Sequence, residues 1–248
     1  MKRCSSINTA PQTMKPLYII SHVACSQPGY LCEYLDQRNI HYVRISIESG
    51  DTLPQPDAVS GLVLLGAPIS VNSDQPWIEQ EMALIRNCAE KEIPVFGICF
   101  GGQLISKAFG GKVYPSPAMQ IGWHPVSTTE QHHPLFNGTA LPAHFHAFEW
   151  HEESFTLPSG ALPLFSDEIT GNQGFIYRSC LAVQFHPEVT PEIIQEWVAR
   201  YEACVDKPAI GTQDHHEILL DVEQKLTAMR KITDLLFDWW IEQTRQVS

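Results

Sequence analysis

The sequence predicts an α/β fold, with a mostly parallel central sheet and helices on both of its faces. Short apolar runs alternate with helical patterns between residues 17 and 109, and a Gly-x-Cys-x-Gly turn joins one run directly to a helix. Hydrophobic residues make up 44% of the 248 residues, enough for a full core. Strands that alternate with helices favour parallel pairing, because each crossover helix covers one face of the sheet.

Four apolar runs in the first half are predicted to be strands of this sheet. They lie at 17–20, 41–47, 61–65 and 94–98. Helices are expected at 29–38, from near Asp74 onward, and from Gly101 to Phe109. In the second of these, Pro76 suits a first-turn position. The apolar residues Ile78, Met82, Ile85 and Ala89 recur at the spacing of one helix face.

The second half has a different pattern but still belongs to the same predicted domain, 16–248. Residues 112–186 are rich in Pro, His and aromatic residues and contain several short strands, the last at 183–185. Thr190 is expected to cap a helix that begins at Pro191. A C-terminal helix is predicted at about 214–243, packed on the domain, and residues 1–15 are expected to be a disordered extension.

Charge and cysteine content narrow the class of protein. The chain has 16 basic and 28 acidic residues, a net charge of −12, which argues against binding to nucleic acid or to anionic membrane surfaces. No apolar run reaches the roughly 18 residues of a membrane-spanning helix. The seven cysteines have no C-x-x-C spacing and are odd in number, which favours free thiols in a reducing compartment, here the cytoplasm.

The Gly97-Ile98-Cys99-Phe100-Gly101 turn is predicted to be a nucleophile elbow. The same arrangement with Ser exposes the nucleophile of α/β hydrolases at a tight strand-to-helix turn. A thiol at a helix N-terminus is favoured as the reactive thiolate. The backbone N–H of Phe100 is in position to donate to an oxyanion.

A cysteine nucleophile needs a base, and Gln184-Phe185-His186-Pro187-Glu188 supplies one near the end of another buried strand. His186 is expected to exchange a proton with Cys99. Glu188 is expected to hold the imidazole in the required tautomer, as the acid of a triad does.

Taken together, Gly-Ile-Cys-Phe-Gly-Gly-Gln at 97–103 and Gln-Phe-His-Pro-Glu at 184–188 resemble the class I, triad-type glutamine amidotransferases. The resemblance covers roughly residues 17–200 and is strongest to stand-alone proteins similar to the glutaminase domain of GMP synthase. It implies a flavodoxin-like fold and release of ammonia from glutamine through a γ-glutamyl thioester on Cys99. It implies no metal and no organic cofactor.

The resemblance also implies roles for other residues. Leu65-Gly66-Ala67-Pro68 stands where the family carries Gly-Gly-Pro, so the N–H of Ala67 would be the second oxyanion donor. Gly66, Gln103 and Trp150 match positions that contact or border the substrate. Ala67 departs from the family's Gly, and Glu152 stands where the family often has Gly.

Three functions remain open at this point. The chain could be a glutaminase that supplies ammonia to a separate synthase subunit, since it has no phosphate-binding loop and only helical patterns after Glu188. It could instead be an independent hydrolase of γ-glutamyl compounds, which predicts a roomier pocket on the leaving-group side. A non-catalytic binding or regulatory protein is disfavoured, because Cys99, His186 and Glu188 are all present.

A few other conspicuous residues are interpreted as structural. His22 and Cys25 follow the first strand at the sheet edge where ligands often bind, and the structural interpretation is favoured for both. Trp239 and Trp240 are expected to pack the C-terminal helix onto the domain.

Overall fold

Nine strands form one central sheet in the part of the chain that the computed structural model describes, residues 15–129, 141–205 and 209–246. They are β1 (Leu17–Ser21), β2 (Tyr42–Ser46), β3 (Gly61–Leu64), β4 (Val95–Ile98), β5 (Val113–Thr128), β6 (His144–Phe155), β7 (Leu162–Ser166), β8 (Gly174–Tyr177) and β9 (Cys180–Val183). Their order across the sheet is β2-β1-β3-β4-β9-β8-β7-β5-β6.

The sheet has a parallel half and an antiparallel half that meet at β9. Strands β2, β1, β3, β4 and β9 pair in parallel, while β8, β7, β5 and β6 extend the sheet in antiparallel fashion. The predicted α/β fold is confirmed, and the parallel half contains the four apolar runs predicted to be strands. The carboxyl ends of β3, β4 and β9 therefore share one edge, where ligands of such sheets bind.

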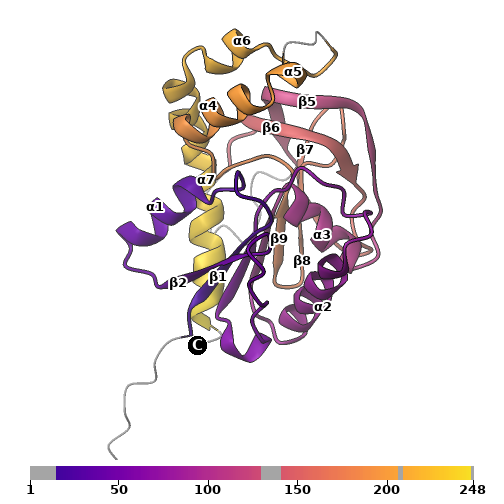
Figure 1. Cartoon of the computed structure of the whole chain (residues 1–248), viewed down its shortest axis with the longest axis vertical. Helices are drawn as coiled ribbons and strands as arrows, with labels where there is room; N and C mark the ends of the chain where they lie inside the picture. Colours follow the sequence, from indigo (N-terminus) through magenta and orange to yellow (C-terminus); the bar gives the residue numbers. More distant parts are fainter. Residues whose placement is uncertain (1–14, 130–140, 206–208, 247–248) are drawn as a thin grey trace, which may run out of the picture.

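Helices cover both faces of the parallel half (Figure 1). One face carries α1 (Gly29–Gln37) and the long α7 (Val222–Gln246), and the other carries α2 (Pro76–Glu90) and α3 (Phe100–Ala108). Neighbouring strand residues alternate between the two cores: Ile19 packs in the cluster of α1 and α7, and Ile20 in that of α2 and α3. This alternation is the period of a strand buried on both faces.

Shorter elements complete the fold. A 3₁₀ turn (Pro56–Ala58) precedes β3. Helices α4 (Pro191–Arg200), α5 (Glu202–Val205) and α6 (His215–Leu219) lie beside one end of β5 and β6 in Figure 1. The Thr190 side chain accepts a hydrogen bond from the Ile193 N–H, so the predicted helix cap is confirmed.

Two predicted boundaries differ from the structure. Strand β9 ends at Val183 and not at Phe185, because its parallel partner β4 turns away into the elbow, where the Cys99 N–H donates to the Val183 carbonyl at 2.9 Å. The single C-terminal helix predicted at 214–243 is two helices, since Asp221 adopts a left-handed backbone (φ 52°) between α6 and α7.

Other expectations concern the ends and the surface. The predicted extension at 1–15 lies, except for its last residue, outside the described residues. Trp239 and Trp240 of α7 are buried, as expected for packing residues. Among the helices described, none combines the length and apolar character needed to cross a bilayer.

Candidate active site

Cys99 sits at the turn between β4 and α3 in a strained backbone conformation. Its φ of 50° and ψ of −108° lie outside the regions that non-glycine residues favour. Such conformations persist where the surrounding structure enforces them, and they cluster at functional sites. Here the turn follows a fully buried strand and leads directly into a helix, so the predicted elbow is present.

The two glycines of the elbow are required by close backbone approach. A Cβ on Gly97 would lie 2.4 Å from the Gly101 carbonyl oxygen, and one on Gly101 would lie 2.2 Å from the Leu64 carbonyl oxygen of β3. Both distances are below any ordinary van der Waals contact. The glycines therefore let α3 start directly against β3 and β4, which fixes the place of the thiol between them.

His186 and Glu188 form a buried pair beside the elbow. The His186 Nδ1 and Glu188 Oε1 atoms are 2.8 Å apart, and both side chains are almost fully inaccessible to solvent. The backbone N–H of His186 donates to the Phe148 carbonyl of β6 at 2.8 Å. Within the described part of the chain, Nε2 of His186 has no hydrogen-bond partner. That nitrogen is therefore available for proton exchange.

The surroundings of His186 favour its protonated form. Burial by itself would lower the pKa of the imidazole, but the Glu188 carboxylate and the Cys99 thiol group outweigh burial and raise the pKa of His186 well above its usual 6.5. The thiol lies close to the ring, since a Cβ built on Gly66 would be 2.9 Å from a carbon of the His186 ring and 3.6 Å from the Cβ of Cys99. His186 therefore keeps its proton to higher pH than a free imidazole does.

A loop after β3 faces the same site and is held in place by Ser26. The Ser26 hydroxyl donates to the Gly66 carbonyl at 2.6 Å. A Cβ on Gly66 would lie 2.9 Å from a carbon of the His186 ring, so glycine is required there. Ala67 is not among the described residues with positive φ, and its methyl group therefore causes no backbone strain. Phe100 is the first residue of α3, where the N–H has no acceptor within the helix.

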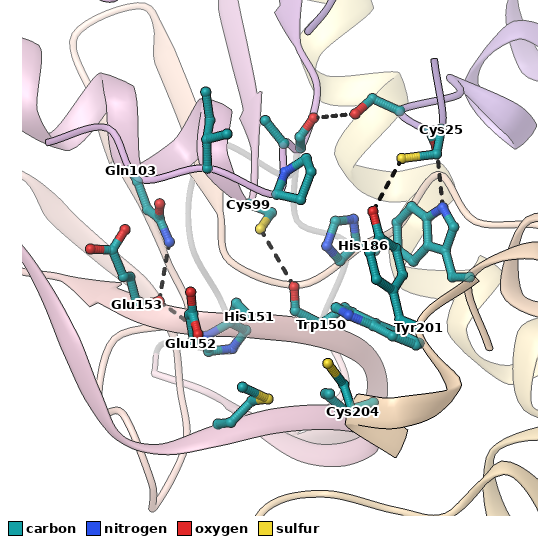
Figure 2. Close-up of a pocket in the computed structure, with 18 of the residues that line it drawn as sticks. Cys25, Cys99, Gln103, Trp150, His151, Glu152, Glu153, His186, Tyr201 and Cys204 are labelled. Atoms are coloured by element: carbon teal, nitrogen blue, oxygen red, sulfur yellow. Dashed lines mark hydrogen bonds between the residues drawn. The ribbon is translucent and has the colours of Figure 1, made fainter. Parts of the chain in front are cut away.

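These parts line one cavity of about 330 Å³. Figure 2 shows Cys99 and His186 next to each other at the cavity, with Tyr201 to one side and Gln103 to the other. The lining includes the predicted triad and the loop after β3, which are Cys99, His186, Glu188, Gly66, Ala67 and Pro68. Its apolar wall includes Met119, Ile121, Trp150, Trp197 and Tyr201. Glu152 and Glu153 add acidic side chains to the lining, and no Lys or Arg is among the described lining residues.

The predicted substrate-contacting residues all reach this cavity, but their polar groups are partly used elsewhere. The Gln103 side-chain amide donates to the Glu153 carbonyl at 3.1 Å and lies 3.4 Å from the Gln184 side-chain oxygen. The Trp150 carbonyl oxygen is 3.9 Å from the Cys99 sulfur. Gln103 and Trp150 therefore link the elbow helix to β6 as well as bordering the cavity.

The sequence did not single out two aromatic residues of the cavity, Trp197 and Tyr201. The Trp197 ring packs edge-on against His186, with 4.9 Å between ring centroids, and its indole N–H donates to the Cys25 carbonyl at 3.1 Å. The Tyr201 hydroxyl is 3.6 Å from the Cys25 sulfur. The spacing of Trp197 and Tyr201, four residues apart at the end of the predicted helix, was the available signal, since it puts Tyr201, the residue after α4, on the same side as Trp197.

Of the two residues after β1, Cys25 lines the cavity and His22 supports the elbow from behind. Nε2 of His22 is 3.0 Å from a carboxylate oxygen of Glu81, with both side chains inaccessible to solvent. The His22 ring packs against Phe100 at 4.7 Å and against Trp77 at 5.2 Å. The structural interpretation therefore holds for His22, whereas Cys25 belongs to the cavity wall.

A mixed sheet flanked by helices, with a cysteine elbow after β4 and a His–Glu pair after β9, places the chain in the α/β class of proteins. Within it, the chain belongs to the class-I glutamine amidotransferase family, whose model, described as "Glutamine amidotransferase class-I", matches residues 30–200.

Its relatives include synthase components and a peptidase. The chain is 30% identical over 187 residues to GMP synthase of Thermosipho africanus, covering 70% of this chain but only 32% of that protein. It is 30% identical to a glutamine-hydrolyzing GMP synthase subunit from Methanococcus maripaludis, covering 62% of this chain and 80% of the relative. It is 29% identical to gamma-glutamyl peptidase 3 of Arabidopsis thaliana, covering 58% of this chain and 60% of the relative.

A solved structure of a glutamine amidotransferase from Methylobacillus flagellatus has a TM-score of 0.86 to this chain. It is 30% identical, and the match covers 93% of this chain and 96% of the other. The likeness therefore extends over nearly the whole chain.

Proposed function

We propose that the chain is a cysteine-dependent hydrolase that releases ammonia from the side-chain amide of glutamine. The observation that carries this proposal is the strained Cys99 at a helix N-terminus, in one cavity with the His186–Glu188 pair. That arrangement provides a nucleophile, a proton carrier and an orienting carboxylate, as acyl transfer by a thiol requires.

The first half of the reaction forms the γ-glutamyl thioester. The Cys99 thiolate attacks the side-chain carbonyl carbon of glutamine, and the electron pair of the C=O bond moves to oxygen. The N–H groups of Phe100 and Ala67 stabilise this oxyanion. As the intermediate collapses, the C–N bond breaks and His186 gives its proton to the leaving nitrogen, so that ammonia departs.

The second half regenerates the thiolate and the protonated imidazole. His186, now neutral, takes a proton from water as the water attacks the thioester carbonyl. The C–S bond breaks, glutamate leaves, and Cys99 is again a thiolate beside protonated His186. Glu188 keeps the same imidazole nitrogen facing the thiol in both halves. Gly66, Gln103 and Trp150 border the bound glutamine in this proposal.

Hydrolysis of larger γ-glutamyl compounds is a second candidate, supported by the shape of the cavity. Its apolar wall of Met119, Ile121 and Tyr201 offers surface that ammonia as a leaving group does not need. Its volume of about 330 Å³ lies in the range of small-molecule clefts. The printed name of the Arabidopsis relative, a gamma-glutamyl peptidase, points the same way.

We expect the glutaminase to act together with a separate synthase subunit, which accepts the ammonia. This expectation is supported by the relative from Methanococcus, which is named as one subunit of GMP synthase and is matched over 80% of its length. The described cysteines are free thiols, which supports a reducing compartment such as the cytoplasm.

The test is a parallel assay of glutamate release from glutamine and from γ-glutamyl peptides, with Cys99→Ala as the inactive variant. We expect a loss of about 10⁴-fold or more on Cys99→Ala, because the covalent route disappears. Cys32→Ala, on α1 and outside the cavity lining, is the matched thiol control and keeps wild-type rates. Catalysis is refuted if neither substrate is hydrolysed, alone or with proteins that co-purify, and a glutamine-like electrophile leaves Cys99 unlabelled.

A further inference from the structure

Three consecutive carbonyl oxygens of the loop that carries the base accept hydrogen bonds from distant elements. The Pro187 carbonyl accepts from Nη1 of Arg230 at 2.8 Å, and the Val189 carbonyl accepts from Nη2 of the same side chain at 2.5 Å. Between them, the Glu188 carbonyl accepts from the Tyr30 N–H at 2.9 Å. One guanidinium therefore binds the carbonyl groups of the two residues that flank Glu188.

Arg230 is itself held in one orientation. It comes from α7, and its guanidinium carbon lies 3.6 Å from the centroid of the Tyr30 ring. The Tyr30 hydroxyl donates to Oδ1 of Asp234, one turn further along α7, at 2.7 Å. Stacking on an aromatic face and two-pronged donation are properties of a guanidinium that an ammonium does not share.

The loop is buried, and these hydrogen bonds act together with the packing of Phe185 and Val189 in the core. It connects β9 to α4 and lies in neither element. A Cβ on Gly29 would lie 2.3 Å from the Glu188 carbonyl oxygen, so the start of α1 is in direct contact with the loop. The position of the Glu188 carboxylate relative to the His186 ring therefore depends on contacts from α1 and α7.

We propose that Arg230 is a positioning residue that holds Glu188 against His186, and that α7 thereby completes the active site from outside the segment that defines the family. This inference rests on the proposed function for its meaning in catalysis. Arg230 does not line the cavity that contains Cys99, so it acts through the loop and not on substrate.

Positioning and simple charge have opposite effects on His186, which makes the proposal testable. Removing a nearby positive charge favours the imidazolium, so a charge effect alone would raise the pKa of His186. Releasing Glu188 from the ring removes the carboxylate that raises the pKa of His186, so loss of positioning lowers it. The other charged groups around Arg230 are Glu33 of α1, Asp234 and Glu223 of α7 and Glu192 of α4, all of which stay in place.

The experiment compares Arg230→Met and Arg230→Lys with Lys231→Met, a control that removes one positive charge from the exposed face of α7. We expect Arg230→Met to lower kcat about 10- to 100-fold with little change in KM. The alkaline limb of its kcat/KM profile should move to lower pH, the direction expected for Glu188→Gln. The kcat and the pH profile of Arg230→Lys should lie between those of Arg230→Met and of the wild type, since an ammonium cannot bind both carbonyls at once.

Two outcomes would overturn the proposal: a folded Arg230→Met with the kcat and pH profile of Lys231→Met, or a limb that moves to higher pH. If Arg230→Met does not fold, the test rests on Arg230→Lys. A wild-type kcat and pH profile in Arg230→Lys would then contradict the positioning role. The rate of Cys99 alkylation by iodoacetamide as a function of pH, followed by peptide mass spectrometry, needs no substrate. It still reports on Arg230 if the wild type hydrolyses no γ-glutamyl compound, an outcome that refutes only the proposed function.

Discussion

The proposed nucleophile and its proposed base are positioned in two different ways. Cys99 is held by its own strand-turn-helix unit, in which Gly97 and Gly101 allow contacts that any side chain would prevent. His186 and Glu188 lie on a loop that depends on Phe148 of β6 and on Arg230 of α7. The place of the nucleophile is thus encoded within a few residues, whereas that of the base is assembled from distant ones.

This difference has an energetic side. The elbow keeps Cys99 at a positive φ, a conformation that costs about 1–3 kcal/mol and needs rigid packing around it. The base loop, residues 184–190, stores no such strain at His186, but it buries a His–carboxylate contact in which the loss of one partner would leave the other buried alone. We expect substitutions that add bulk to displace Cys99 at the elbow. We expect substitutions that remove a hydrogen-bond or ion-pair partner to displace His186 and Glu188 on the base loop.

The largest effects are expected on the base loop itself. His186→Gln removes the proton carrier and should cost about 10⁴-fold or more in kcat, whereas Glu188→Gln should cost one to two orders of magnitude less, since an orienting group contributes less than the base. Exposed Glu192, at the start of α4, gives the matched control Glu192→Gln with wild-type rates. Equal losses for both variants would contradict this ranking.

The pH profile sharpens the same comparison. The first half of the reaction needs the protonated imidazole, so kcat/KM should fall as pH rises through the raised pKa of His186. In Glu188→Gln the carboxylate that raises this pKa is gone, and the alkaline limb should move to lower pH. An unchanged limb would mean that Glu188 does not set the proton affinity of His186.

A glycine substitution tests the elbow. In Gly101→Ala the new methyl group meets the Leu64 carbonyl, which forces α3 away from β3. We expect a loss of about 1–3 kcal/mol in unfolding free energy and about 10²-fold in kcat, because Cys99 moves with the helix. Gly50→Ala is the control, since Gly50 has a positive φ but nothing near its Cβ. It should lose stability through conformation alone and keep full activity.

The same division explains what could be predicted from the sequence. The parallel strands and the elbow leave signals within short windows, namely apolar runs and Gly-x-Cys-x-Gly, and the structure confirms their location. The hydrogen bonds of Arg230 to Pro187 and Val189 join residues some forty positions apart, and no local pattern marks them. The break at Asp221 was missed because the apolar spacing continues through it, while the backbone there turns left-handed.

The smallest effect is expected at the loop after β3, where the two modes of positioning meet. Ser26→Ala removes the hydrogen bond to the Gly66 carbonyl, and the loop with Ala67 should lose order next to His186. Loss of one such bond corresponds to about 1 kcal/mol, so kcat should fall about tenfold or less. Ser21→Ala removes a comparable bond, to the Ile45 carbonyl at 3.1 Å, away from the cavity. Both variants should lose a similar free energy of unfolding in urea, and only Ser26→Ala should lose activity. Equal activities of the two variants would mean that contacts other than the Ser26 hydrogen bond hold the loop after β3 in place.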